Sequence, residues 1–238
     1  METPALRFRN VTKNYAKAPV LKGVDVVVEH GESFAVVGIN GAGKTTLIKG
    51  MLDLCGLDGG SIEIYGIDHR LRQARKRLAF LPERLNPPAH LTGTEFLRYI
   101  TQLHGTSYVA GDVERMFDAL DLDLSVLSKP VYTCSKGMAQ KLGLAACFLR
   151  QPDLYVFDEP MSGLDPKARA LVKQYLRTCV ARNHTLFFTS HALSDVEEIG
   201  ERMAILHQGA LRFVGTPAQC RTTFGTDSLE QAFLCCIA

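Results

Sequence analysis

Apolar residues along this chain follow two different patterns, and each pattern predicts a different kind of β-strand. Short β-branched segments separated by turn residues predict an antiparallel sheet at one edge of the molecule. These segments are LRFRNV (6–11), VDVVVE (24–29) and SIEIYGI (61–67). More continuously apolar segments predict parallel strands that helices cover on both faces. They are SFAVVG (33–38), LAFLPE (78–83), LYVFDE (154–159) and TLFFTS (185–190).

Between about residues 83 and 152 the strand pattern disappears and helical spacing takes over. The segment at 91–105 opens with a capping box from Thr92 to Glu95, and a second amphipathic helix is expected at 111–123. A hairpin turning at Gln208 and Gly209 should follow, and then a short helix-like tail.

These elements predict a single α/β domain with a mostly parallel sheet, an N-terminal antiparallel β subdomain and an inserted α-helical subdomain. The expected catalytic core covers about residues 1–83 and 153–238, and the expected helical subdomain about 84–152. A chain of 238 residues is long enough to bury a sizeable core.

The run GINGAGKT at 38–45 fits the phosphate-loop pattern G-x-x-x-x-G-K-[ST] between an apolar strand and a helix. Its glycines allow backbone N–H groups to turn inward onto phosphate oxygens, and the helix start favours an anion. The fold class is therefore a P-loop NTPase core, with kinases, GTPases and transport ATPases still open. The expected nucleotide-binding residues of this run are Gly38, Asn40, Gly41, Ala42, Gly43, Lys44, Thr45 and Thr46.

Four further motifs follow in order. In LYVFDEP (154–160), Asp158 and Glu159 end an apolar strand, where they suit a Mg²⁺ ligand and a base that polarises water. The run CSKGMAQ (134–140) starts a helix that is expected to carry one apolar face, which makes its start a second anion-binding end. The remaining two are SGLDP (162–166) and TSH (189–191).

On these five motifs the chain resembles the nucleotide-binding subunit of ATP-binding cassette (ABC) transporters, from about Leu6 to Pro217. The resemblance implies that residues 38–45 are the Walker A motif, 154–160 the Walker B motif and 162–166 the D-loop. It also places CSKGM in register with the LSGGQ signature. The family acts as a head-to-tail dimer, in which each signature closes on the ATP held by the other subunit.

The resemblance also implies a role for individual residues. Lys44, Glu159 and His191 would be catalytic, with His191 the switch histidine. Thr45, Asp158 and Glu83 would face Mg²⁺, and Tyr15 would stack on adenine from a loop after the first strand. The residues expected to meet the opposite subunit's ATP are Ser135, Lys136, Gly137, Met138 and Asp165. ATP and Mg²⁺ are thus the expected cofactors.

Two departures from the family pattern favour one subgroup. Glu83 stands where the Q-loop usually has glutamine, and the signature has Cys134, Lys136 and Met138 in place of Leu, Gly and Gln. The combination of LPE with SKGM followed by QKLGLA resembles exporter-type subunits. The expected function is therefore ATP hydrolysis that powers export through a separate transmembrane permease.

Composition adds the expected location. Hydrophobic residues make up 46% of the chain, yet no apolar run approaches the roughly 20 residues that span a bilayer. The first ten residues lack the apolar stretch of a signal peptide. We therefore expect a cytoplasmic protein, peripheral on the cytoplasmic face of a membrane, which the family resemblance suggests is the bacterial inner membrane.

Charge and cysteine usage exclude other classes. The net charge of +2 does not favour nucleic acid, and the basic run at 70–77 is expected to be the solvated face of a short helix or a contact with a partner subunit or lipid headgroups. Seven cysteines in no ligand pattern are expected to be reduced.

Three alternatives remain open from sequence. An ABC ATPase acting on ribosomes or DNA would usually carry two cassettes or a long coiled coil, neither of which is present. A non-hydrolysing regulatory subunit would be expected to have lost Glu159 or Lys44. An import subunit is the nearest rival within transport. A homodimer is expected, and the transported substrate is not determined.

Overall fold

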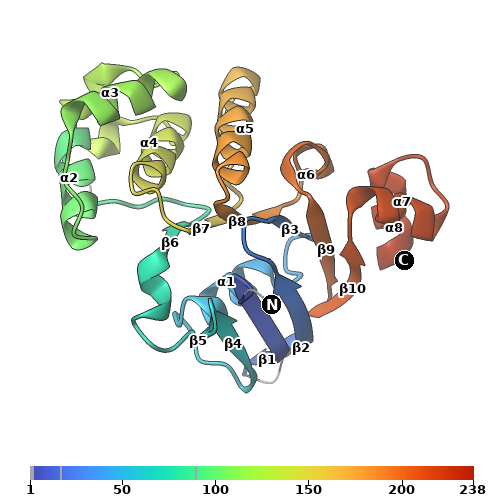
Figure 1. Ribbon diagram of the computed structural model, residues 1–238. Helices are drawn as coiled ribbons and strands as arrows, with labels where there is room; N and C mark the ends of the chain where they lie inside the picture. The colour runs from blue at the N-terminus through green and yellow to red at the C-terminus, as the bar shows by residue number, and fades with distance from the viewer. Residues whose placement is uncertain (1–2, 17, 89) are drawn as a thin grey trace.

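The computed structural model describes residues 3–16, 18–88 and 90–238, which form two sheets and the helices around them (Figure 1). The N-terminal sheet is antiparallel, with strand order β2-β1-β4-β5. Its strands are β1 (Leu6–Tyr15), β2 (Ala18–Val28), β4 (Gly59–Ile64) and β5 (Ile67–Asp68). The predicted antiparallel edge is confirmed, although SIEIYGI forms two strands, because a turn at Tyr65 and Gly66 interrupts it.

The second sheet has strand order β10-β9-β3-β8-β7-β6, and every pair except β9–β10 is parallel. Its strands are β3 (Ser33–Val37), β6 (Leu78–Leu81), β7 (Leu154–Asp158), β8 (Thr185–Ser190), β9 (Arg202–His207) and β10 (Ala210–Gly215). The predicted parallel strands and the predicted hairpin are both confirmed.

The parallel sheet is buried on both faces because alternate residues of each strand enter different cores. In β3, Phe34 and Val36 pack toward the antiparallel sheet and α1 (Lys44–Met51), whereas Ala35 and Val37 pack toward the helices on the other face. Figure 1 shows these helices gathered on one side of the sheet and the antiparallel sheet on the other.

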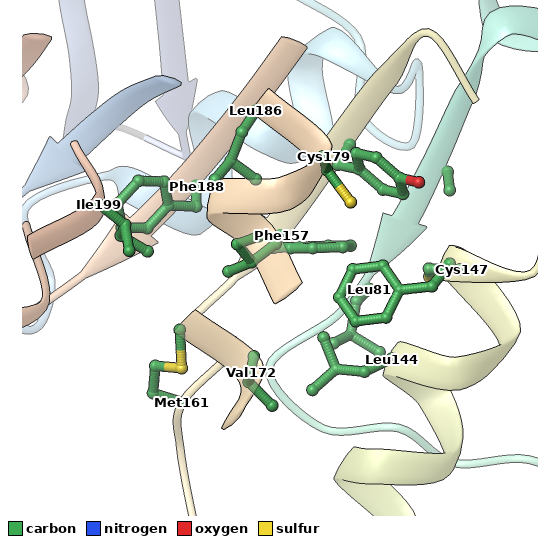
Figure 2. Packing of buried hydrophobic residues seen from close by; sticks show 14 of the residues in the cluster. Leu81, Leu144, Cys147, Phe157, Met161, Val172, Cys179, Leu186, Phe188 and Ile199 are labelled. Atoms are coloured by element: carbon green, nitrogen blue, oxygen red, sulfur yellow. The ribbon is translucent and has the colours of Figure 1, made fainter. Parts of the chain in front are cut away.

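The core on the helical side joins strands to helices that are distant in sequence. Figure 2 shows Phe157 of β7 between Leu186 of β8, Leu144 of α4 (Lys136–Phe148) and Val172 of α5 (Pro166–Ala181). Each fully buried side chain of this kind contributes about 1.5–3 kcal/mol through removal from water. This packing holds the carboxyl ends of the central strands in place.

Residues between β6 and β7 form the helical part of the molecule, with α2 (Gly93–Leu103) and α3 (Ala110–Ala119) before α4. The predicted capping box at the start of α2 is confirmed: the Thr92 backbone N–H donates to Glu95 Oε2 over 2.8 Å, and the Glu95 N–H donates to Thr92 Oγ1 over 3.3 Å. Helix α4 differs from its predicted single apolar face, since residues 140–148 are buried without a break.

Three smaller helices complete the fold: α6 (Leu193–Ile199), α7 (Pro217–Phe224) and α8 (Leu229–Ile237). The predicted helix-like tail is thus two helices, and both contact β10. No helix within the described residues is long and apolar enough to cross a membrane.

The basic run at 70–77 ends in a short 3₁₀ helix (Ala74–Arg77), and its charges are mostly paired within the chain. Arg70 lies 2.6 Å from Asp68 and holds the pKa of that carboxyl far below its usual range. Arg77 lies 2.7 Å from Asp153 and over the ring of Tyr65. With Arg75, which lies 3.5 Å from Asp53, three of the five basic residues of the run have an acidic partner.

Candidate nucleotide-binding site

The phosphate loop, residues 38–43, connects the end of β3 to the start of α1. Gly38 lies close to strand β9, so a Cβ at this position would fall 2.4 Å from the Leu206 carbonyl oxygen. Gly43 has φ +110°, a conformation that residues with a Cβ rarely adopt. The motif therefore needs glycine at both positions: Gly38 has no room for a Cβ, and Gly43 has a φ that other residues rarely adopt.

The turn between β9 and β10 supports the phosphate loop from outside. The Gly209 N–H donates to the Ala42 carbonyl over 3.2 Å, and the Gly209 carbonyl accepts the Lys22 N–H over 2.8 Å. Gly209 of the β9–β10 turn thus connects the phosphate loop to β2.

Lys44, the first residue of α1, is only 7% exposed. Its Nζ donates to the Gly38 carbonyl over 2.6 Å and to the Ile39 carbonyl over 3.4 Å, and it lies 3.7 Å from Glu159 Oε1. The ammonium group is therefore held over the loop next to a carboxylate, where an incoming phosphate could take over its donors.

Asp158 and Glu159 follow one another at the carboxyl end of β7, and Thr189 of the adjacent strand β8 connects them. Its Oγ1 donates to Asp158 Oδ1 over 2.6 Å and accepts the Glu159 N–H over 2.9 Å. Glu159 has φ +53°, an uncommon conformation for a residue with a side chain. Thr189 belongs to the TSH motif, but the sequence analysis assigned it no role. Its place at the end of a strand next to the one that carries Asp158 could have indicated that the two residues are in contact.

His191 comes just after β8, and its Nδ1 lies 2.9 Å from Glu159 Oε2. The His191 side chain is 65% exposed, whereas the Glu159 side chain is 10% exposed. One buried carboxylate is thereby placed between a buried lysine and an exposed imidazole. Such a group can accept a proton from, or orient, a water molecule at the mouth of the site.

These groups open into one cavity of about 560 Å³. Its lining includes most of the residues predicted to face nucleotide or Mg²⁺: Tyr15, Asn40, Gly41, Ala42, Gly43, Lys44, Thr45, Thr46, Glu83, Asp158, Glu159 and His191. Val20 and Ile39 also line it, and sequence reasoning missed both. Apolar contacts of this kind would suit the base and ribose of a nucleotide.

Tyr15 lies at the end of β1 rather than in a loop after it, and its side chain is 46% exposed. The neighbouring Cys55 thiol raises the pKa of Tyr15. The Lys13 ammonium lies 5.5 Å from the centroid of the ring, which lines the cavity.

The residues predicted to contact the opposite subunit's ATP lie outside this cavity. Ser135 caps α4 by accepting the Met138 N–H over 3.2 Å, and Asp165 caps α5 by accepting the Ala168 N–H over 2.9 Å. The structure thus separates the predicted residues into a cavity set and a set at the starts of α4 and α5.

The fold and the cavity define a nucleotide-binding α/β protein with a phosphate loop. Comparison with known proteins identifies its family. The family model described as ABC transporter matches residues 21–162.

Two curated relatives give the same result. An uncharacterized ABC transporter ATP-binding protein of Synechocystis is 38% identical over 85% of this chain, which spans 58% of that relative's length. A Nod factor export ATP-binding protein I of Burkholderia orbicola is 34% identical over 97% of this chain and 77% of its own length.

Solved structures agree with both. The structure of an ATP binding subunit of an ABC transporter matches with a TM-score of 0.87 and 31% identity, over 97% of this chain and 98% of that one. A dimeric ATP-binding cassette in a post-hydrolysis state, bound to ADP and Pi, matches with a TM-score of 0.80 over 89% of this chain and 98% of that one; at 20% identity it supports the fold alone. The chain belongs to the ABC transporter family, as one of its ATP-binding ATPase subunits.

Proposed function

We propose that this chain binds ATP in the 560 Å³ cavity and hydrolyses it to power export through a separate transmembrane permease. The observation that carries the proposal is the connection Lys44–Glu159–His191, with separations of 3.7 Å and 2.9 Å, at the mouth of the phosphate loop. A buried carboxylate between a phosphate-binding cation and an exposed imidazole is an arrangement that suits hydrolysis of a terminal phosphate.

In this proposal each part of the cavity has one task. The backbone of residues 38–46 and Lys44 hold the phosphates, while Tyr15 stacks on the base. Glu159 polarises the attacking water, and His191 orients both the water and the terminal phosphate.

Thr45, Asp158 and Glu83 line the same cavity and would hold Mg²⁺. Magnesium in such sites takes only one or two protein oxygens, with phosphates and waters completing its shell. Asp158 suits this task because Thr189 binds one carboxylate oxygen and leaves the other free to act as a ligand. Bound Mg²⁺ would neutralise charge on the phosphates.

We infer a head-to-tail dimer of two copies of this chain. Ser135, Lys136, Gly137 and Met138, together with Asp165, lie at helix starts outside the cavity, so their expected ATP is that of the other subunit. A cassette of the same fold has been solved as a dimer.

The LPE and SKGM motifs and the Nod factor export relatives support export over import. The permease would dock on the helical subdomain, about residues 84–152, at the cytoplasmic face of the bacterial inner membrane. A largely apolar groove of about 260 Å³ between β6, α2 and α4 suits an amphipathic helix of that partner, with Leu85, Phe96 and Ile100 among its lining residues.

The test is Mg²⁺-dependent ATP hydrolysis by the purified chain at increasing protein concentration, beside Glu159→Gln and Ser135→Arg. Turnover per subunit should rise with concentration in the wild type and disappear in both variants, while both still bind ATP. Glu114→Gln, an exposed carboxylate on α3, is the matched control and should behave as wild type. Equal turnover in Glu159→Gln would refute the assignment of the water-polarising carboxylate.

A further inference from the structure

Two side chains of α4 tie its start to the segment that follows Glu159. Lys136 Nζ donates to Ser162 Oγ over 3.1 Å, and Gln140 Nε2 donates to the Pro160 carbonyl over 3.0 Å. Because the two residues are four apart in one helix, they lie on the same face. Helix α4 therefore contacts residues 160–162, which follow Glu159, at two points.

The lysine stem is fitted to this position. Gly163 has φ +78°, and a Cβ there would fall 2.8 Å from Lys136 Cδ and 2.9 Å from Cε. The methylenes of Lys136 thus lie across a glycine that leaves room for them. Glycine, which the family's signature has at position 136, would have no side chain to make this contact.

The segment that α4 contacts directly follows Glu159, a residue of the site with a positive φ. Glu159 has φ +53°, and the Ser162 N–H donates to the Glu159 carbonyl over 3.0 Å, which closes a turn. A residue in this conformation persists only where its surroundings hold it. Thr189 holds Glu159 from the strand side, and Lys136 and Gln140 hold the turn from the helix side.

The contact of Lys136 is also easy to exchange. The first turn of α4 contains no acidic residue, and among the described residues no carboxylate lies within ion-pair distance of Lys136. A cation at a helix N-terminus is opposed by the helix dipole. A neutral hydroxyl is therefore a weak partner for this ammonium, and a phosphate would be a much stronger one.

We propose that Lys136 is a positioning residue that links the two ATP sites of the dimer. In the free subunit it holds the Glu159 turn through Ser162. When the dimer closes, its ammonium leaves Ser162 for the terminal phosphate of the partner subunit's ATP, and the turn that carries Glu159 is released. Hydrolysis in one site then depends on occupancy of the other. The exchange step rests on the head-to-tail dimer proposed above, whereas the Ser162 contact does not.

The first experiment needs no dimer. Hydrogen exchange of the backbone amides at 161–164 is measured in the free subunit without nucleotide. Lys136→Met should raise the exchange rate about fivefold, as loss of one hydrogen bond implies. Lys136→Arg should restore protection, and Lys76→Met, which removes an exposed lysine elsewhere, should change nothing. Unchanged exchange in Lys136→Met would overturn the proposal.

The second experiment measures ATP-driven dimerisation in the Glu159→Gln background and the ATP dependence of hydrolysis without that substitution. Lys136→Met should weaken the dimer about tenfold, whereas Ser162→Ala, which frees the lysine, should tighten it about fivefold. The Hill coefficient for ATP should fall toward one in both variants. If the unmodified background forms no dimer, the proposed function fails; if the dimer forms and both variants keep the normal Hill coefficient, only the present inference fails.

Discussion

Helices α1 and α4 begin with similar chemistry, a lysine in a glycine-containing motif, but their surroundings differ. Lys44 of α1 is buried beside Glu159 at the edge of a cavity, at the carboxyl ends of the neighbouring strands β3, β8 and β7. Lys136 of α4 is exposed, and within the part of the chain that the structure describes its ammonium donates to a serine hydroxyl and meets no carboxylate. At α1 the neighbouring strands supply the groups that complete a phosphate site; in the proposed dimer, the start of α4 would be half of such a site.

The largest effect on ATP binding should come from Lys44→Ala, which removes the buried cation of the complete site. Loss of charge-assisted hydrogen bonds of about 1.5–3 kcal/mol each should weaken ATP binding at least about a hundredfold. Titration calorimetry measures it, and Lys49→Ala, at an exposed lysine of the same helix, is the control. If Lys136→Ala weakened ATP binding to the free subunit equally, the contrast between the two helix starts would be wrong.

Glu159→Gln should leave ATP binding nearly intact and lower the rate of phosphate release by about 10²–10⁴-fold, the usual contribution of general base catalysis. The neutral amide keeps the shape of the side chain but cannot take a proton. Retained binding with lost turnover would place Glu159 in the chemistry alone. Lost binding would instead show that Glu159 is needed to build the cavity.

Thr189→Val should lower the free energy of unfolding by about 1–3 kcal/mol, because the buried Glu159 N–H loses its acceptor. Turnover should fall as well, since the same hydroxyl orients Asp158. Denaturant titration and phosphate release measure the two effects. Thr178→Val, at an exposed threonine of α5, is the control, and an equal loss of stability there would remove the special role of Thr189.

The smallest effect is expected away from both helix starts, at the exposed Asp68–Arg70 pair. Because Arg70 lowers the pKa of Asp68 in the folded state, the pair stabilises the protein above the unfolded carboxyl pKa of about 4, and this contribution is lost as pH falls through the lowered value. Asp68→Asn should therefore lower the unfolding free energy by less than about 1 kcal/mol at pH 7, since solvent screens the pair. A difference that persisted unchanged in acid would contradict the ionic origin.

The elements of the complete site could be predicted because their signals are local. Glycine is required at position 43 because the φ of that residue is positive. The strands before the phosphate loop and before Glu159 are recognised by their mostly apolar sequences. The capping box at Thr92 is likewise a contact within four residues. Features of this kind depend on a residue and its near neighbours in the sequence, so they can be predicted without knowing the tertiary structure.

The remainder depends on partners that sequence order does not indicate. Residues 140–148 of α4 are buried on every side because α2, α3 and β6 pack against the helix, so Gln140 is inside although it is polar. The role of Thr189 depends on β8 pairing with β7, and the Lys136–Ser162 contact depends on how α4 packs against the D-loop. Such pairings are set by tertiary packing rather than by local propensity.

The bond between Gly209 and Ala42 has a consequence for the making of the protein. Because translation runs from the N-terminus to the C-terminus, the phosphate loop leaves the ribosome well before the β9–β10 turn. The nascent chain therefore has the nucleotide-binding motif before it has the hydrogen bond that braces it, and a translation product interrupted between the two would carry the motif without that brace.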